Sequence, residues 1–222
     1  MRWVVLVVVA VAAAVAFALR PEHAASPTLY VTLALTYAVL AGFALYRMWD
    51  DGTLLDLLKP RWGDFSIGVL IAAVLLVGSW AGRALIAPVG SPRHGWLLRV
   101  YLLLGDTETI QSSVLITSLL LLIPVLEEIV WRGMVLSLLA ERFGTRRAWP
   151  IAAVLYALAL TPTAFTLADP EAGYNPLLCV AALGCGIFWS FTAQMTKRLP
   201  PVIISHIAFT YFSVAQFRLP GM

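Results

Sequence analysis

Three ionisable residues stand inside a long apolar stretch of the chain. Glu127 and Glu128 follow the largely apolar run 118–126, and Arg132 is followed at once by the apolar run 134–139. An ionised side chain at the depth of the bilayer core costs a few kcal/mol or more, so such residues usually face a cavity or a partner and take part in function. We therefore expect this cluster to do chemistry. The alternative is a group of charges that only locks helices together.

Helical geometry gives the two carboxylates different surroundings. Glu128 and Arg132 are four residues apart, which places them on one face of a helix where they can pair. Glu127 lies about 140° round the helix from Arg132, at roughly 100° per residue, so its carboxylate is freer. A carboxyl group in a low dielectric, beside a like charge and without a fixed partner, has the properties of a general base for water.

Two polar residues further along the chain could complete a site. His206 stands in an apolar run eight residues after Arg198, and Thr210 follows four positions later, on the same helical face. An imidazole and a hydroxyl can both donate hydrogen bonds to a developing oxyanion. Taken alone, His206 is more simply an ordinary hydrogen-bonded residue of a core.

These residues resemble the motifs of the CPBP family, the CAAX proteases and bacteriocin-processing enzymes that are also called the ABI family. The block EEIVWR from Glu127 to Arg132 is similar to the family's EExxxR signature, and the segment 184–206 resembles its closing part, which carries an HxxxN or HxxxD motif. The likeness covers residues 118–212. It implies an intramembrane endopeptidase of glutamic type in which Glu127 is the base. Glu128 and Arg132 would hold the helix, and His206 with Thr210 would support the oxyanion.

The chain departs from the family pattern at two positions. The family's middle motif is FxxxH, and the matching place has Tyr156 followed by Leu160 where the histidine is expected. Thr210 stands where an asparagine or aspartate is usual, although a hydroxyl still donates. General acid–base help is worth about 10²–10⁴-fold in rate, so the missing histidine predicts a slow enzyme or a silent one.

Two other functions fit the same residues. A catalytically silent relative could bind a membrane segment as an immunity or assembly factor, and a small transporter could use the buried acids as a proton relay. We expect no cofactor and no metal, because zinc sites show three protein ligands in recognisable spacing and the chain has no HExxH motif.

The elements that position these residues are predicted to be membrane-spanning helices. Hydrophobic residues make up 61% of the 222 positions and charged residues only 12%, against about 25% charged in soluble domains. The formal charge of +3 is scattered between apolar runs, which excludes the basic surface of a nucleic-acid-binding protein. The fold class is therefore all-α, a polytopic membrane helical bundle of about seven transmembrane helices.

Seven apolar runs account for these spans: 3–19, 27–48, 65–86, 112–142, 149–165, 174–195 and 199–217. Between the second and third, residues 54–58 predict a short amphipathic helix on the membrane surface. The run 97–104 is too short to span and is expected to be interfacial or re-entrant. The single membrane domain divides into N-terminal helices (1–110) and a protease-like core (111–222). Residues 1–20 could be a cleaved signal, but their long apolar run favours a retained helix.

Basic residues gather at alternate connections between the spans. The larger group consists of Arg2, Arg47, Lys59, Arg61, Arg142, Arg146, Arg147, Lys197 and Arg198. The positive-inside rule makes this side cytoplasmic, with the N-terminus inside. The abundance of Ala, Val and Leu fits a bacterial inner membrane. The expected partners are the lipid bilayer and a membrane-associated protein or peptide substrate.

Overall fold

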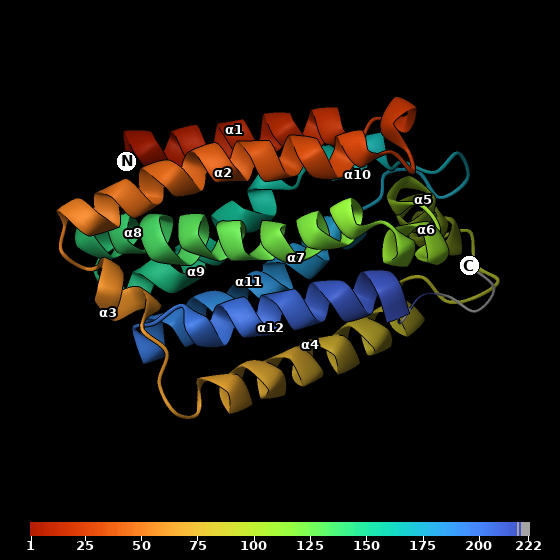
Figure 1. Cartoon of the computed structure of the whole chain (residues 1–222). Helices are drawn as coiled ribbons and strands as arrows, with labels where there is room; N and C mark the ends of the chain where they lie inside the picture. Colours follow the sequence, from red (N-terminus) through yellow and green to blue (C-terminus); the bar gives the residue numbers. More distant parts are fainter. Residues whose placement is uncertain (217, 219–222) are drawn as a thin grey trace.

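The computed structural model describes residues 1–216 and 218, and helices form almost all of its regular structure (Figure 1). In chain order they are α1 (Arg2–Ala18), α2 (Pro27–Asp50), α3 (Leu54–Leu58), α4 (Asp64–Ile86), α5 (His94–Leu104), α6 (Thr107–Ser112), α7 (Val114–Glu128), α8 (Leu136–Phe143), α9 (Thr145–Ala159), α10 (Pro162–Thr166), α11 (Leu177–Thr196) and α12 (Pro200–Tyr211). A 3₁₀ turn, η1 (Pro21–His23), follows α1, and two π-helical segments, η2 (Ile129–Val135) and η3 (Phe212–Gln216), continue α7 and α12. The predicted all-α class is confirmed.

Five helical stretches of the described residues are long and apolar enough to cross a membrane. They are Pro27–Asp50, Asp64–Ile86, Val114–Phe143, Thr145–Thr166 and Leu177–Thr196. The other two predicted spans correspond to shorter helices: α1 has 17 residues, and α12 has 12 before it continues into η3. The count of seven therefore stays a prediction.

The connections that carry the larger basic group lie together at one end of the bundle. Arg47 pairs with Glu141 at 3.6 Å, and the Leu199 amide donates to the Leu57 carbonyl at 2.8 Å. Figure 1 shows the N-terminus and α3 at this end, and α5 and α6 at the opposite end. The five-residue helix α3 forms where the amphipathic stretch predicted it. Which compartment this end faces stays a prediction.

The helix that carries the acid pair is capped at its start and changes its winding at its end. The Ser113 hydroxyl accepts the Ile116 amide at 3.3 Å, which caps the start of α7. Pro124 removes one backbone donor within α7, and the π-helical segment η2 begins directly after Glu128. Such π segments occur often at functional sites.

A close approach between α4 and α12 fixes the helix that carries His206. A Cβ atom built on Gly68 would lie 2.8 Å from the Ile204 side chain and 2.8 Å from the Pro201 carbonyl oxygen. At the start of α4, the buried Asp64 pairs with Arg198 at 2.6 Å. A glycine and an ion pair thus set the position of α12 against α4.

Substitution of Gly68 by alanine should destabilise the bundle, because the added methyl group overlaps the α12 backbone. We expect a loss of about 1–3 kcal/mol, the usual range for overpacking, measured as a lower Tm in detergent. Gly78→Ala on the same helix is the matched control, since nothing lies within 4 Å of a Cβ at that position. Equal Tm values for the two variants would contradict the close approach.

Candidate active site

The structure brings His206 between the two carboxylates. His206 Nδ1 lies 2.7 Å from Glu128 Oε1, and His206 Nε2 lies 3.4 Å from Glu127 Oε2. The two acids end α7 while the imidazole comes from α12, 78 residues further along the chain. Both ring nitrogens therefore face a carboxylate.

Glu128 and Arg132 form the pair that their spacing predicts. Arg132 Nη1 donates to Glu128 Oε1 at 3.1 Å, and both side chains are fully buried. The guanidinium also lies against two aromatic rings, with its Cζ 4.7 Å from the ring centre of Tyr156 and 5.3 Å from that of Trp189. Aromatic faces thus surround a charge that has no contact with solvent.

Glu127 differs from Glu128 in its exposure to solvent. Its side chain is 14% exposed, whereas that of Glu128 is 0% exposed. A carboxylate that reaches the edge of the packed core can meet a water molecule, and a fully enclosed one cannot. This difference fits the division into a freer acid and a partnered acid that helical geometry predicts.

The imidazole of His206 is held from the side by Trp189. The two rings stack with centroids 3.8 Å apart and planes inclined by 25°. Trp189 Nε1 in turn donates to the Ser205 hydroxyl at 3.0 Å, which fixes the indole relative to α12. The histidine ring therefore has partners at both nitrogens and on one face.

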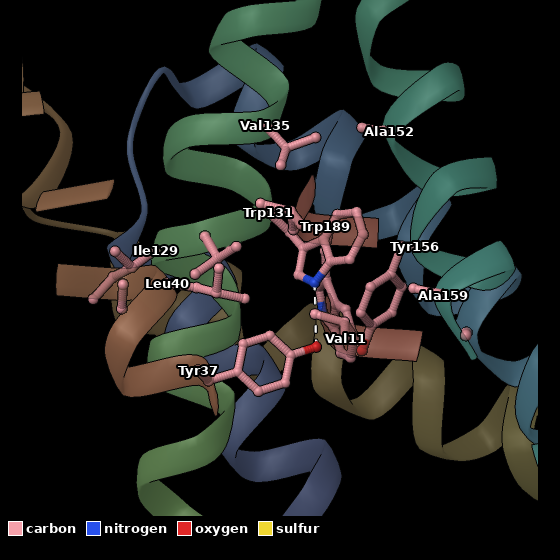
Figure 2. Close-up of a cluster of buried hydrophobic side chains, with 14 of the residues drawn as sticks. Val11, Tyr37, Leu40, Ile129, Trp131, Val135, Ala152, Tyr156, Ala159 and Trp189 are labelled. Carbon is pink, nitrogen blue, oxygen red and sulfur yellow. Dashed lines mark hydrogen bonds between the residues drawn. The ribbon is translucent and has the colours of Figure 1, made fainter. Parts of the chain in front are cut away.

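Sequence reasoning missed two tyrosines beside Glu127. The Tyr156 hydroxyl donates to Glu127 Oε2 at 3.1 Å, and the hydroxyl of Tyr37, from α2, also interacts with this carboxyl. Figure 2 shows Tyr37 and Tyr156 in the aromatic cluster with Trp131 and Trp189. The available signal was a tyrosine at the phenylalanine position of the FxxxH motif. No local pattern pointed to Tyr37.

Two further positions of the family pattern are Leu160 and Thr210. Leu160 follows the end of α9, and its carbonyl accepts the Thr163 hydroxyl at 2.7 Å. Thr210 lines a cavity of about 540 Å³ bounded by α4, α5, α11, α12 and η3, together with Arg83 and Tyr101. Among the described residues, the structure gives no side-chain hydrogen bond between Thr210 and either Glu127 or His206. Its role in the site stays a prediction.

His94 joins a different cavity. It lies at the start of α5 and borders a surface hollow with Arg99 and Asp169. Within residues 1–216 and 218, no group of three His, Cys, Asp or Glu side chains is arranged to hold a metal ion. The absence of a metal from the working protein stays a prediction.

Comparison with known families agrees with the motifs. Residues 109–212 match the family described as type II CAAX prenyl endopeptidase Rce1-like. The matched segment contains both acids, Arg132, Tyr156 and His206. Comparisons with curated proteins and with solved structures gave no match. The resemblance to the CPBP family is confirmed over this segment, and together with the apolar helices it supports an integral membrane protein of the CPBP type.

Removal of the Arg132 charge should unfold the site. Arg132→Gln leaves Glu128 buried without its cationic partner, and breaking a buried pair in this way costs about 3–5 kcal/mol. Arg47→Gln is the matched control, because Arg47 forms an i,i+4 pair with Asp51 at a partly exposed surface, where about 1 kcal/mol or less is expected. Thermal unfolding in detergent measures both variants. Similar losses would contradict a special role of the buried pair.

Proposed function

Because residues 109–212 match the family described as type II CAAX prenyl endopeptidase Rce1-like, we propose that this protein is an intramembrane endopeptidase of glutamic type. It hydrolyses a peptide bond of a membrane-associated protein or peptide, with Glu127 as the general base. The observation that carries the proposal is the 3.4 Å approach of His206 Nε2 to Glu127 Oε2, inside a segment that matches this family.

The proposed reaction uses water as the nucleophile. Glu127 accepts a proton from the water, and the oxygen attacks the peptide carbonyl to form a tetrahedral intermediate. The same proton then passes to the amine that leaves, so Glu127 returns to its ionised form. Glu128 and Arg132 hold His206 beside the base and prevent it from turning.

The geometry favours one of the roles open to His206. With Nδ1 bonded to Glu128 and Nε2 facing Glu127, the imidazole is placed to orient the base and to share its proton. The oxyanion role that the resemblance implies needs the Nε2–H to turn toward a substrate carbonyl. We therefore assign His206 first to the partnership with Glu127.

The substrate class proposed first is a peptide with a prenylated cysteine followed by two aliphatic residues and a variable C-terminal residue. This class corresponds to the CAAX prenyl endopeptidases that residues 109–212 match. A farnesylated CAAX peptide in proteoliposomes is the corresponding probe. Release of the C-terminal tripeptide reports cleavage.

Glu127→Gln should abolish this cleavage and leave the fold intact. The amide keeps the shape of the side chain but cannot take a proton from water, so the rate should fall by about 10²–10⁴-fold or more. Glu141→Gln, a change at an exposed acid, should cleave at the wild-type rate. Wild-type turnover by a folded Glu127→Gln protein would remove Glu127 from the mechanism.

One observation favours a second function, a catalytically silent relative that binds a membrane segment. Leu160 stands where the family motif has a histidine, so a proton-transfer partner is missing. If the rest of the machinery is intact, Leu160→His should raise turnover of the farnesylated peptide by about tenfold or more. Leu158→His, at an exposed position in the last turn of α9, is the control. A silent wild type with an active Leu160→His variant would support the second function.

A further inference from the structure

Two tyrosines from different helices lie beside the carboxyl group of Glu127: the Tyr156 hydroxyl donates to it at 3.1 Å, and the Tyr37 side chain interacts with it. We propose that Tyr37 and Tyr156 are positioning residues that hold Glu127 in its working orientation, in place of the histidine absent at position 160. The inference rests on the proposed function, because it concerns the carboxylate assigned there as the base.

Tyr156 is fixed tightly enough to aim its hydroxyl. Its ring lies beneath the Arg132 guanidinium and meets the Trp131 ring edge to face, with centroids 5.3 Å apart. A Cβ atom built on Gly186 would lie 3.3 Å from the ring, so α11 leaves it little room on that side. The hydroxyl donates to Glu127 Oε2 at 3.1 Å.

The Tyr37 hydroxyl accepts a hydrogen bond from Trp131, so its own hydrogen is available to a second partner. Trp131 Nε1 donates to the Tyr37 oxygen at 3.3 Å, and a phenol has a single hydrogen of its own to give. That hydrogen can point toward the neighbouring Glu127 carboxyl, with which the Tyr37 side chain interacts, while Figure 2 shows the bond from Trp131 that Tyr37 accepts. The buried Tyr37 belongs to α2, outside the family match, so the N-terminal helices contribute to the site.

These contacts position the base without replacing the missing proton carrier. Hydrogen bonds from neutral hydroxyls to a carboxylate are charge-assisted, and they favour the ionised, proton-accepting form. A phenol keeps its proton near neutral pH, so neither tyrosine takes a proton from water. The proton released by water therefore stays on Glu127 until the leaving amine receives it.

Tyr30 provides a built-in comparison on the same helix. It is as buried as Tyr37, with 2% and 1% exposed, but its hydroxyl donates to the backbone carbonyl of Leu104 at 2.9 Å. Loss of this hydroxyl removes a buried hydrogen bond and leaves Glu127 untouched. Tyr30→Phe therefore separates a purely structural effect from an effect on the base.

The kinetic experiment compares Tyr37→Phe, Tyr156→Phe and Tyr30→Phe on the farnesylated CAAX peptide in proteoliposomes. Each of the first two should lower kcat by about 10–100-fold with KM little changed, since each removes one hydrogen bond to a charged group that does not bind substrate. Tyr30→Phe should keep the wild-type kcat. Wild-type kcat in both Tyr37→Phe and Tyr156→Phe would overturn the inference.

A second measurement does not depend on turnover. Dicyclohexylcarbodiimide reacts with protonated carboxyl groups, so its labelling of Glu127 at a fixed neutral pH, read by mass spectrometry, reports how well the ionised form is held. Tyr37→Phe and Tyr156→Phe should each label about tenfold faster than wild type, and Tyr30→Phe at the wild-type rate. Wild-type labelling rates in Tyr37→Phe and Tyr156→Phe would refute the positioning role.

The two measurements separate the two proposals. Faster labelling in both variants, with a wild type that cleaves no peptide, would leave the positioning role standing and refute the proposed protease function. Cleavage by the wild type, with labelling and kcat unaffected in both variants, would support the protease function and refute the positioning role. A lower Tm shared equally by all three phenylalanine variants, without the other changes, would mark the hydroxyls as structural only.

Discussion

One carboxylate oxygen, Oε1 of Glu128, joins the two halves of the site. It accepts Arg132 from η2 at 3.1 Å and faces His206 from α12 at 2.7 Å. None of these side chains has appreciable contact with solvent, so each charge or polar group depends on the others for its stability. If this oxygen were lost, an arginine and a histidine would be left buried without their shared partner, and the distance between His206 and Glu127 would no longer be fixed.

The surrounding helices hold Glu128, Arg132 and His206 together in different ways. The π-helical segment η2 continues the helix from α7 into α8 and places Arg132 four residues after Glu128, on the same face. Tyr156 and Trp189 supply aromatic faces to the guanidinium, and Trp189 also stacks on the imidazole. Helix α12 is pressed onto α4 at Gly68, so His206 cannot move away from the acids without moving a packed helix.

The two adjacent acids acquire different chemistry from this arrangement. Glu128 is enclosed and paired with Arg132 and His206, whereas Glu127 keeps 14% of its side chain exposed and, among the described residues, has tyrosine and imidazole partners. Paired carboxylates in unlike environments are a common way for enzymes to separate a structural acid from a reactive one. The same difference supports the proposed role of Glu127 as an oriented base beside a single histidine.

The sequence by itself determined the membrane character, the all-α class, the acid and arginine cluster, and the family resemblance that residues 109–212 confirm. It also predicted the pairing of Glu128 with Arg132, because contacts between residues four apart follow from helical geometry alone. Only the tertiary structure decided that His206 lies between both acids, that Tyr37 and Tyr156 reach Glu127, and that Thr210 lines another cavity. Two hydrogen bonds among them join residues 29 and 78 positions apart in the chain. Contacts over such separations depend on how whole helices pack against one another. The rotation and depth at which one helix meets another depend on side-chain packing along its full length, which no short motif encodes.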